Sequence, residues 1–419
     1  MELIFIERDP FSLYYDCHIL ECVVPSRAGG AASSLDEVLM KDIAALHRAE
    51  YDTAPDIIAA APGVVKFLGE HTEGSDGLVL AAALSFEIQV AISLRRDSSL
   101  RFFAADLGER KRTSVGNLKF KREDRWANYP KGVLDLLVKE GLPAKGVNFT
   151  IAGDIPIGLG LASSAALGLA SAMAFKELFG LNKRGEELAD LTRRAEAEFL
   201  GHPVPSYDHL TAAAPAGGTV SIVDIRSDRR RAVPFLDGDN IVVLTDSKVP
   251  RVNVEAELEQ RAADCQKCLS VLARGSPKTL RDFGPEEVDE LMGILPESVR
   301  RRCLHVVEEI ARVGEAEDAL IKGDAAAFGR AVNKSHASLR NLYEVSCPEI
   351  DWLAKRATEI DGVLCSRLTG KGFGGCTVTV MAESALPEYK KRLEDYERIF
   401  GFRPAVHEAR LAGGLRVVG

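Results

Sequence analysis

The segment that most constrains the fold is a glycine-containing turn from Pro156 to Ala166, which leads into a run of small residues ending near Phe179. Gly158 and Gly160 let the backbone adopt positive φ angles and come close to a ligand. A serine at the end of the turn can cap the following helix, and the free N–H groups at the start of that helix form an anion site. No Gly-Lys-Ser/Thr closes the turn, so it is not a Walker A loop. The turn is therefore either a phosphate-binding loop or a plain capped turn.

A second glycine cluster lies between Thr369 and Cys376, directly before a β-type run. Four glycines in six residues are costly in backbone entropy unless the backbone must approach another group closely. Taken alone, this cluster is interpreted as a bulged β-turn. Two such clusters in one acidic chain favour an enzyme that binds a nucleotide.

The composition restricts the class of protein further. The 419 residues are 46% hydrophobic and 27% charged, which allows a real core and about two to four domains. With 53 basic and 62 acidic residues, the net charge of −9 offers no general attraction to nucleic acid or anionic membranes. No apolar run reaches the roughly 18 residues of a membrane span, and the eight cysteines are too sparse for a disulfide scaffold. We therefore expect a cytoplasmic protein that binds neither nucleic acid nor membrane, and nothing implies a protein partner.

Strands and helices are mixed along the chain without regular alternation, which predicts an α+β fold with two lobes. Residues 1–35 are interpreted as an extension that ends in a linker, followed by a charged helix over about 36–50. Residues 57–65 are interpreted as a strand, a turn and another strand, and Leu78 to Leu94 as a pair of strands. Further strands are expected at 147–151, 220–223, 241–244 and 377–381, with a basic turn between the second and third of these, and helices over 164–179, 253–345 and 387–399.

Two polar segments are candidates for substrate recognition and catalysis. Gly69 to Glu73 follows a β-type run, and its carboxylates and imidazole (Glu70, His71) suit a polyhydroxylated ligand. The alternative is a solvated turn. Asp208 lies between apolar stretches and is either a general base or a helix cap.

Five collinear segments together resemble the GHMP kinase superfamily, and more closely the galactokinase family, from about Ala61 to the C-terminus. Pro156–Ala166 is similar to the superfamily's phosphate loop. Gly69–Glu73 resembles the galactokinase signature Gly-Glu-His-Thr-Asp. The other three segments are Trp126–Gly132, which in the family lies near the adenine, Ser335–Arg340 with Tyr343–Glu349, and Arg367–Thr377, which resembles the third superfamily motif.

The resemblance implies a two-lobed GHMP kinase fold, with the active site in the cleft between an N-terminal domain (36–220) and a C-terminal domain (221–419). It implies ATP and Mg²⁺ as cofactors, with Ser164 and Glu196 as metal-binding residues. Without the resemblance, Glu196 would be interpreted as a solvated helix carboxylate. Asp208 falls where the family has its catalytic Asp. The implied sugar-binding residues are Glu70, His71, Glu73 and Asp208. The implied ATP-binding residues are Trp126, Gly158, Gly160, Leu161, Ala162, Ser163, Ser164, Ala165 and Gly372.

The chain departs from the family pattern on the sugar side. Galactokinases usually have Pro-Gly-Arg-Val-Asn where this chain has Pro62–Lys66, so Val64 stands at the position of the family Arg. Residues 64 and 66 share one face of a strand, and we hypothesise that Lys66 is catalytic and supplies the missing positive charge near Asp208. The alternative is a lysine that reaches solvent while Val64 packs in the core. The other departures are Glu73, where the family has Asp, Val204–His209, where it has Cys-Gly-Ile-Met-Asp-Gln, and Val249, where it has a Tyr that packs on the sugar.

Three functions are therefore compatible with the sequence. The first is a phosphotransferase that uses ATP to phosphorylate the anomeric hydroxyl of galactose, in galactose metabolism. The second is a kinase for a related sugar or sugar derivative. The third is a catalytically weak protein that binds ATP and sugar and regulates a partner. The nucleotide half of the function is better supported than the sugar half.

Overall fold

The fold is described from a computed structural model, which gives residues 42–214, 217–236, 238–276 and 278–418. The expected extension over residues 1–35 and the first part of the helix expected over 36–50 lie outside the described residues. The described part of that helix is α1 (Ile43–Tyr51). Within these four ranges, no helix combines the length and the apolar character that crossing a membrane requires.

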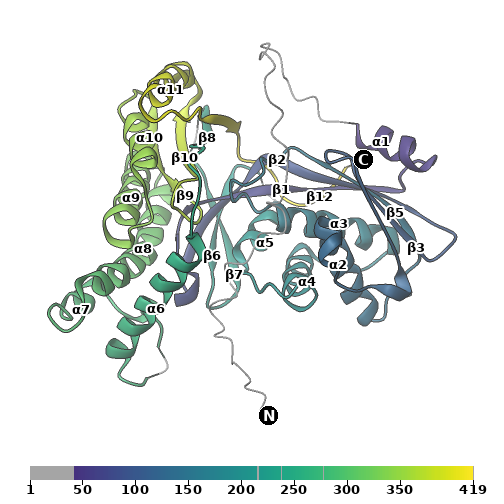
Figure 1. The fold of residues 1–419 in the computed structure, drawn as a ribbon, viewed down its shortest axis with the longest axis horizontal. Helices are drawn as coiled ribbons and strands as arrows, with labels where there is room; N and C mark the ends of the chain where they lie inside the picture. Colours follow the sequence, from purple (N-terminus) through teal and green to yellow (C-terminus); the bar gives the residue numbers. More distant parts are fainter. Residues whose placement is uncertain (1–41, 215–216, 237, 277, 419) are drawn as a thin grey trace.

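The larger of two sheets contains eight strands, and a layer of helices covers one of its faces (Figure 1). Its strands are β1 (Ile57–Leu68), β2 (Leu78–Leu94), β3 (Ser99–Ala104), β4 (Glu109–Ser114), β5 (Val147–Gly153), β6 (Thr219–Asp224), β7 (Arg229–Pro234) and β12 (Arg416–Val417). The strand order is β12-β1-β2-β5-β3-β4, and β6 and β7 extend the sheet from β2. The covering helices are α2 (Asn128–Lys139), α3 (Ser163–Phe179), α4 (Gly185–Glu198) and α5 (Tyr207–Ala212). Figure 1 shows α1 on the opposite face of the sheet.

Three expectations about strands of this sheet are wrong. Residues 57–65 contain no turn, because β1 runs on through a register shift between Pro62 and Val64, and such a bulge bends a strand without ending it. Leu78 to Leu94 is one strand that pairs first with β6 and later with β5 along the same side. The expected basic turn after residue 223 contains β7, which forms a hairpin with β6. An exposed edge strand needs no alternation of apolar residues. The arginines of β7 therefore gave no strand pattern in the sequence.

The smaller sheet is antiparallel and packs against a layer of helices. Its strands are β8 (Asn240–Asp246), β9 (Val363–Thr369), β10 (Cys376–Ala382) and β11 (Ala405–Ala409), in the order β11-β8-β10-β9. The helices are α6 (Val254–Ala273), α7 (Pro285–Asp289), α8 (Glu297–Ile321), α9 (Ala325–Ser338), α10 (Pro348–Thr358) and α11 (Leu386–Phe400). Figure 1 shows α8 to α11 stacked along one side of this sheet. Short 3₁₀ turns lie at Glu73–Ser75, Val115–Asn117, Arg122–Ala127, Leu280–Asp282 and Glu383–Ala385, and a π-helical turn spans Leu339–Tyr343.

The α+β prediction is confirmed. The two sheets share one hydrophobic cluster, and strands from the second half of the chain belong to the larger sheet. One hydrophobic cluster contains side chains of both sheets, such as Val64 of β1 and Val378 of β10. Beyond residue 220, β6 and β7 still belong to the larger sheet, and β12 returns to pair with β1. Next to β12, the N–H of Leu415 donates to the carbonyl of Ala212 in α5 at 2.9 Å. The division of the chain at residue 220 stays a prediction.

Gly329 in α9 predicts a stability difference between two helical glycines. A Cβ at Gly329 would lie 2.6 Å from the backbone oxygen of Leu364 in β9, whereas a Cβ at Gly314 in α8 would meet nothing within 4 Å. Gly329→Ala should therefore destabilise the fold by about 1–3 kcal/mol, because α9 must move away from the sheet. Gly314→Ala should be neutral or should stabilise it by up to about 1 kcal/mol. Urea unfolding of both variants checks this, and equal midpoints would contradict it.

Candidate active site

The glycine turn predicted to bind phosphate connects β5 to α3. Its backbone is left-handed at Gly158 (φ 80°), Gly160 (φ 73°) and Ala162 (φ 55°). Leu159 and Leu161 are buried, whereas both glycines are exposed, and a Cβ added to either glycine would meet nothing within 4 Å. The leucines therefore anchor the turn, and the glycine backbone stays open to a ligand.

The same turn is tied to β1 and ends at the start of α3. The N–H of Val64 donates to the carbonyl of Leu161 at 3.0 Å, and a Cβ at Gly63 would lie 3.2 Å from that oxygen. The N–H groups of Ser163 and Ser164 donate to no described residue, as is usual in the first turn of a helix. The turn is therefore fixed beside the part of β1 that carries the predicted catalytic lysine.

Lys66 is a buried cation held between carboxylates. It shares a face of β1 with Val64, because the pairing with β2 is regular between them. Val64 packs in the core, and Lys66 is only 7% exposed, so the alternative of a lysine that reaches solvent is wrong. Lys66 Nζ lies 3.0 Å from Glu70 Oε1, pairs with Glu73 and stands 4.5 Å from the centre of the Tyr207 ring. Burial lowers the pKa of Lys66, but the two carboxylates outweigh burial and hold that pKa well above its usual value.

Asp208 follows Tyr207 in α5 and has an unusual pKa. Burial raises the pKa of Asp208 to about 7; the positive charges of His209 and Lys66 oppose this rise, and Glu196 and Glu73 add to it. A carboxyl group with a pKa near neutrality is a stronger base than an ordinary aspartate, and it is well matched to proton transfer at neutral pH. The structure therefore brings Asp208 and Lys66 within electrostatic reach of each other.

Glu70 links this cluster to the smaller sheet. Its Oε1 pairs with Lys66, and its Oε2 accepts from Arg367 of β9 and, at 3.3 Å, from the N–H of Gly370. Arg367 is fully buried and also donates to the carbonyl of Phe67 at 2.7 Å. A carboxylate that the sequence predicted to bind sugar is thus held by cations from both sheets.

A second buried carboxylate, Glu309 in α8, fixes the turn that follows β1. Its Oε1 accepts from the N–H of Gly69 at 3.0 Å, and its Oε2 accepts from Arg312 at 2.9 Å. Burial raises the pKa of Glu309, but Arg312, His305 and Arg367 outweigh burial and bring it to about 2. Sequence reasoning missed Glu309, because nothing in the sequence distinguishes it from a solvated helix carboxylate. Arg367, in contrast, lies within a segment that the sequence singled out.

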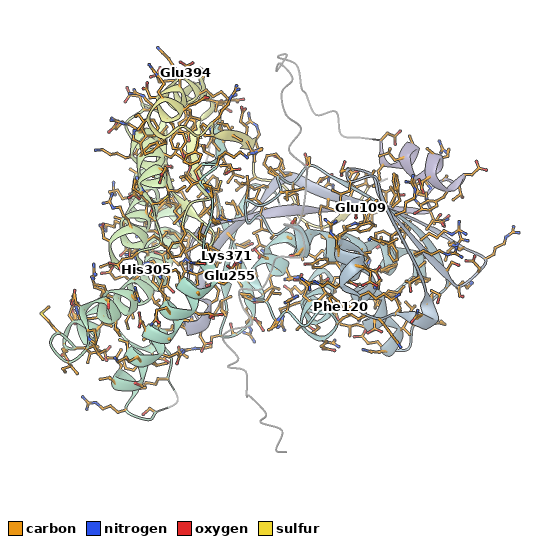
Figure 2. The ribbon with its side chains drawn as sticks, in the orientation of Figure 1. Glu109, Phe120, Glu255, His305, Lys371 and Glu394 are labelled. Atoms are coloured by element: carbon orange, nitrogen blue, oxygen red, sulfur yellow. The ribbon has the colours of Figure 1, made fainter. Side chains whose placement is uncertain are left out.

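His71, which the sequence predicted to bind sugar, is held by ring stacking. Its backbone is left-handed (φ 61°), and its ring centre lies 4.6 Å from that of Tyr343, with 20° between the planes. The ring centre of His305 lies 4.7 Å from that of the same tyrosine. Figure 2 shows His305 among the helices that pack against the smaller sheet. Burial lowers the pKa of His71 well below its usual value, and the charges of His305 and Lys66 lower it further. His71 Nε2 is buried and bonds to no described residue.

The two residues predicted to bind Mg²⁺ are oxygen donors at the ends of two helices. Glu196 of α4 is 2% exposed, so it is not the solvated carboxylate that its sequence alone would suggest. Its Oε1 lies 3.0 Å from His209 Nε2, and no other described residue forms an ion pair with it. Ser164 is half-buried at the start of α3. A carboxylate and a hydroxyl fit Mg²⁺, which takes few protein oxygens and completes its shell with water and phosphate. Among the described residues, no three or more His, Cys, Asp or Glu side chains gather into a metal site.

Trp126, predicted to lie near the adenine, is part of the core. It is 2% exposed, and its ring packs edge-on against Phe102 at 6.5 Å between centres. Its indole N–H donates to Glu109 Oε2 at 2.9 Å. Figure 2 shows Glu109 in the part of the molecule that contains the larger sheet. A role of Trp126 in binding ATP stays a prediction.

The second glycine cluster makes the close approach that its composition indicates. A Cβ at Gly372 (φ 88°) would lie 2.5 Å from the backbone oxygen of Val345, so only glycine fits there. Next to it, Lys371 Nζ lies 3.3 Å from Glu255 Oε1 of α6, and Figure 2 shows these two side chains close together. A role of Gly372 in binding ATP also stays a prediction.

Two family models match parts of the chain that contribute to this site. Residues 128–214 match the GHMP kinases N terminal domain, and residues 316–395 match the GHMP kinases C terminal model. A crystal structure of mevalonate kinase has a TM-score of 0.60 at 19% identity, covers 85% of this chain and 99% of its own, and supports the fold alone. The fold is that of a GHMP kinase.

A third family model and several relatives show which family of GHMP kinases the chain belongs to. Residues 45–94 match the galactokinase galactose-binding signature. A putative galactokinase of Treponema pallidum (strain Nichols) is 36% identical over 386 residues, which cover 90% of this chain and 97% of the relative. The galactokinase of Homo sapiens is 33% identical over 378 residues, 88% of this chain and 94% of its own. The crystal structure of Lactococcus lactis galactokinase complexed with galactose has a TM-score of 0.81 at 27% identity and covers 89% of this chain and 98% of its own. The chain belongs to the galactokinase family.

Proposed function

We propose that this protein transfers the γ-phosphoryl group of ATP to the anomeric hydroxyl of galactose. Membership of the galactokinase family supports this activity. The observation that carries the proposal is the electrostatic influence of the buried Lys66 on Asp208, whose pKa is raised to about 7. Lys66 stands on a strand that is hydrogen-bonded to the glycine turn. In the reaction a bond forms between the sugar oxygen and the γ-phosphorus, and the bond from that phosphorus to the β–γ bridging oxygen breaks.

Asp208 is the proposed base. Its ionised carboxylate accepts the proton of the anomeric hydroxyl as that oxygen attacks the phosphorus, and a positioned base of this kind contributes about 10²–10⁴-fold to the rate. Lys66 is the second proposed catalytic residue. Its buried ammonium favours the ionised form of Asp208 and compensates the negative charge that gathers around the transferred group.

The sugar-binding side of the proposal uses the carboxylates at the end of β1. Glu70 and Glu73 each accept from Lys66, and a carboxylate has further lone pairs for sugar hydroxyls. His71 has a buried Nε2 that bonds to no described residue, and it can donate to or accept from a hydroxyl. These residues orient the hydroxyl that Asp208 deprotonates.

The nucleotide side of the proposal uses the glycine turn and the start of α3. The open backbone at Gly158 and Gly160 and the N–H groups of Ser163 and Ser164 would hold the ATP phosphates. Ser164 and Glu196 would hold Mg²⁺, which, when bound, neutralises phosphate charge during transfer. Trp126, Leu161, Ala162, Ala165 and Gly372 complete the proposed ATP site.

The proposed activity predicts ADP release that depends on galactose. A coupled assay of the protein with ATP and a panel of hexoses should show turnover with galactose, and Asp208→Asn should lower kcat by about 10²–10⁴-fold while ATP binding is kept. Turnover only with another sugar would identify a related sugar kinase. Tight binding of ATP and sugar without turnover would instead support a sensor.

Lys66 predicts a shift in the pH dependence of the same assay. Activity should fall as the pH drops below about 7, because the proposed base becomes protonated. Lys66→Met removes a charge that lowers the pKa of Asp208, so that pKa should rise and the acidic limb of kcat/KM should move to higher pH. On that limb, each unit by which the pKa rises should lower kcat/KM at a fixed pH by about tenfold. Lys66→Arg keeps the charge and should keep the limb near its original position. An unmoved limb in Lys66→Met would rule out this role, even if the variant melts at a lower temperature.

Variants of the glycine turn should impair the use of ATP and leave galactose binding nearly unchanged. Ser164→Ala should raise the KM for ATP or lower kcat, because it removes a proposed metal ligand. Gly160→Val should weaken ATP binding more strongly, because a β-branched residue resists the left-handed backbone at this position. Equilibrium binding of galactose should change little in both variants. Unchanged ATP kinetics in both would exclude this turn as the nucleotide site.

A further inference from the structure

Tyr207, the first residue of α5, has a hydroxyl among the proposed catalytic and sugar-binding groups. Its ring centre lies 4.5 Å from Lys66 Nζ, and it directly precedes Asp208 in the chain. The charges of Asp208, Lys66, Glu73 and Glu70 all act on the hydroxyl. The phenol oxygen of Tyr207 therefore lies within electrostatic reach of the proposed base and of both proposed sugar-binding carboxylates.

This hydroxyl is accessible and has no partner within the described part of the chain. Tyr207 is half-buried. Its hydroxyl forms no hydrogen bond with a described residue, and it is not among the buried polar atoms that are closed off from solvent. Burial raises the pKa of Tyr207 well above its usual value, and the charge of Asp208 raises it further. The phenol therefore stays protonated at neutral pH and can donate a hydrogen bond to a ligand.

A hydrogen-bond donor complements the proposed sugar site, which is built mainly from acceptors. Carboxylates only accept hydrogen bonds, so Glu70, Glu73 and the ionised Asp208 can bind the protons of sugar hydroxyls but not their oxygens. Lys66 uses its ammonium group on Glu70, Glu73 and the Tyr207 ring. The family has Met at the position of Tyr207, and Met has no hydrogen to donate. The hydroxyl of Tyr207 is therefore a donor that this chain adds to the family pattern.

We propose that Tyr207 contacts the substrate, and that its hydroxyl donates a hydrogen bond to the oxygen of a sugar hydroxyl other than the anomeric one. This inference rests on the proposed function, in which the anomeric oxygen attacks phosphorus. That oxygen needs its lone pair for the attack, so a donor serves another hydroxyl better. A sugar without the contacted hydroxyl leaves the phenol unpaired in a half-buried site, which makes Tyr207 a specificity-determining residue.

A thermodynamic cycle tests the contact without turnover. Galactose and each of its monodeoxy derivatives are titrated into the wild-type protein and into Tyr207→Phe, with the heat of binding as the measurement and no nucleotide present. Tyr207→Phe keeps the ring over Lys66 and removes only the hydroxyl, so it should weaken galactose binding by about three- to tenfold. For one monodeoxy sugar the same substitution should change the affinity by less than about twofold, because the hydrogen bond is already absent. Equal weakening of galactose and of every monodeoxy sugar would overturn the proposal.

A second tyrosine provides the matched control. Tyr51 belongs to α1, on the opposite face of the larger sheet from α5 (Figure 1), and its hydroxyl donates to the carbonyls of Arg101 and Phe149, each at 3.1 Å. Tyr51→Phe should therefore lower the melting temperature and leave galactose binding unchanged, whereas Tyr207→Phe should do the reverse. A lower melting temperature of Tyr207→Phe with an unchanged affinity for galactose would mean that the hydroxyl is structural, and would overturn the proposal.

The wild-type titration separates this inference from the proposed function. Galactose that binds the wild-type protein and Tyr207→Phe equally well contradicts the inference alone. If the wild-type protein binds another sugar instead of galactose, the proposed galactose activity fails, and the same cycle with the deoxy derivatives of that sugar decides the role of Tyr207. A protein that binds no sugar would contradict both.

Discussion

The buried ion pair between Arg367 and Glu70 is the contact on which the candidate site depends, because it joins a strand of the smaller sheet to the turn that ends β1. Both side chains are removed from water, and buried ions are tolerated only when opposite charges and hydrogen bonds compensate the loss of hydration. Arg367 has Glu70 and two backbone carbonyls, and Glu70 has Arg367, Lys66 and the N–H of Gly370. Separating the lobes would leave these charges unpaired, so the network fixes one relative position of the two sheets.

The network also holds in place the lysine that we propose as a substitute for the family's arginine. A guanidinium is planar and rigid in its contacts, whereas an ammonium on a four-carbon stem is flexible. Here the surroundings supply the missing rigidity, because Glu70, Glu73 and the Tyr207 ring hold Lys66 from three directions. Val64, at the position of the family Arg, fills core space next to the glycine turn. Lys66, two residues further along the same face of β1, lowers the pKa of Asp208.

Features set by local chemistry were predictable from the sequence. The glycine turn with its helix of small residues, the strand at 147–151 and the α+β class follow from backbone freedom and hydrophobic pattern. The continuity of β2 was not predictable, because its 17 residues are shared between two partners that lie far apart in the chain. Glu309 was missed for a similar reason, since it contacts a turn that lies 240 residues earlier. Candidate site residues that lie within a motif could be named from the sequence, whereas Glu309, which joins the site only by tertiary contact, could not.

The return of β12 to the larger sheet has a consequence for how the protein is made. Residues 42–234 build seven strands of that sheet, yet among the described residues β1 has no partner on its outer edge until residues 416–417 pair with it. Those residues also bring Leu415 to the end of α5, the helix that carries Asp208. During synthesis at about 5–20 residues per second, this edge of the larger sheet therefore stays open for roughly ten seconds or more. An unpaired edge is a site for association between chains, so chaperone dependence should be concentrated in this interval of translation.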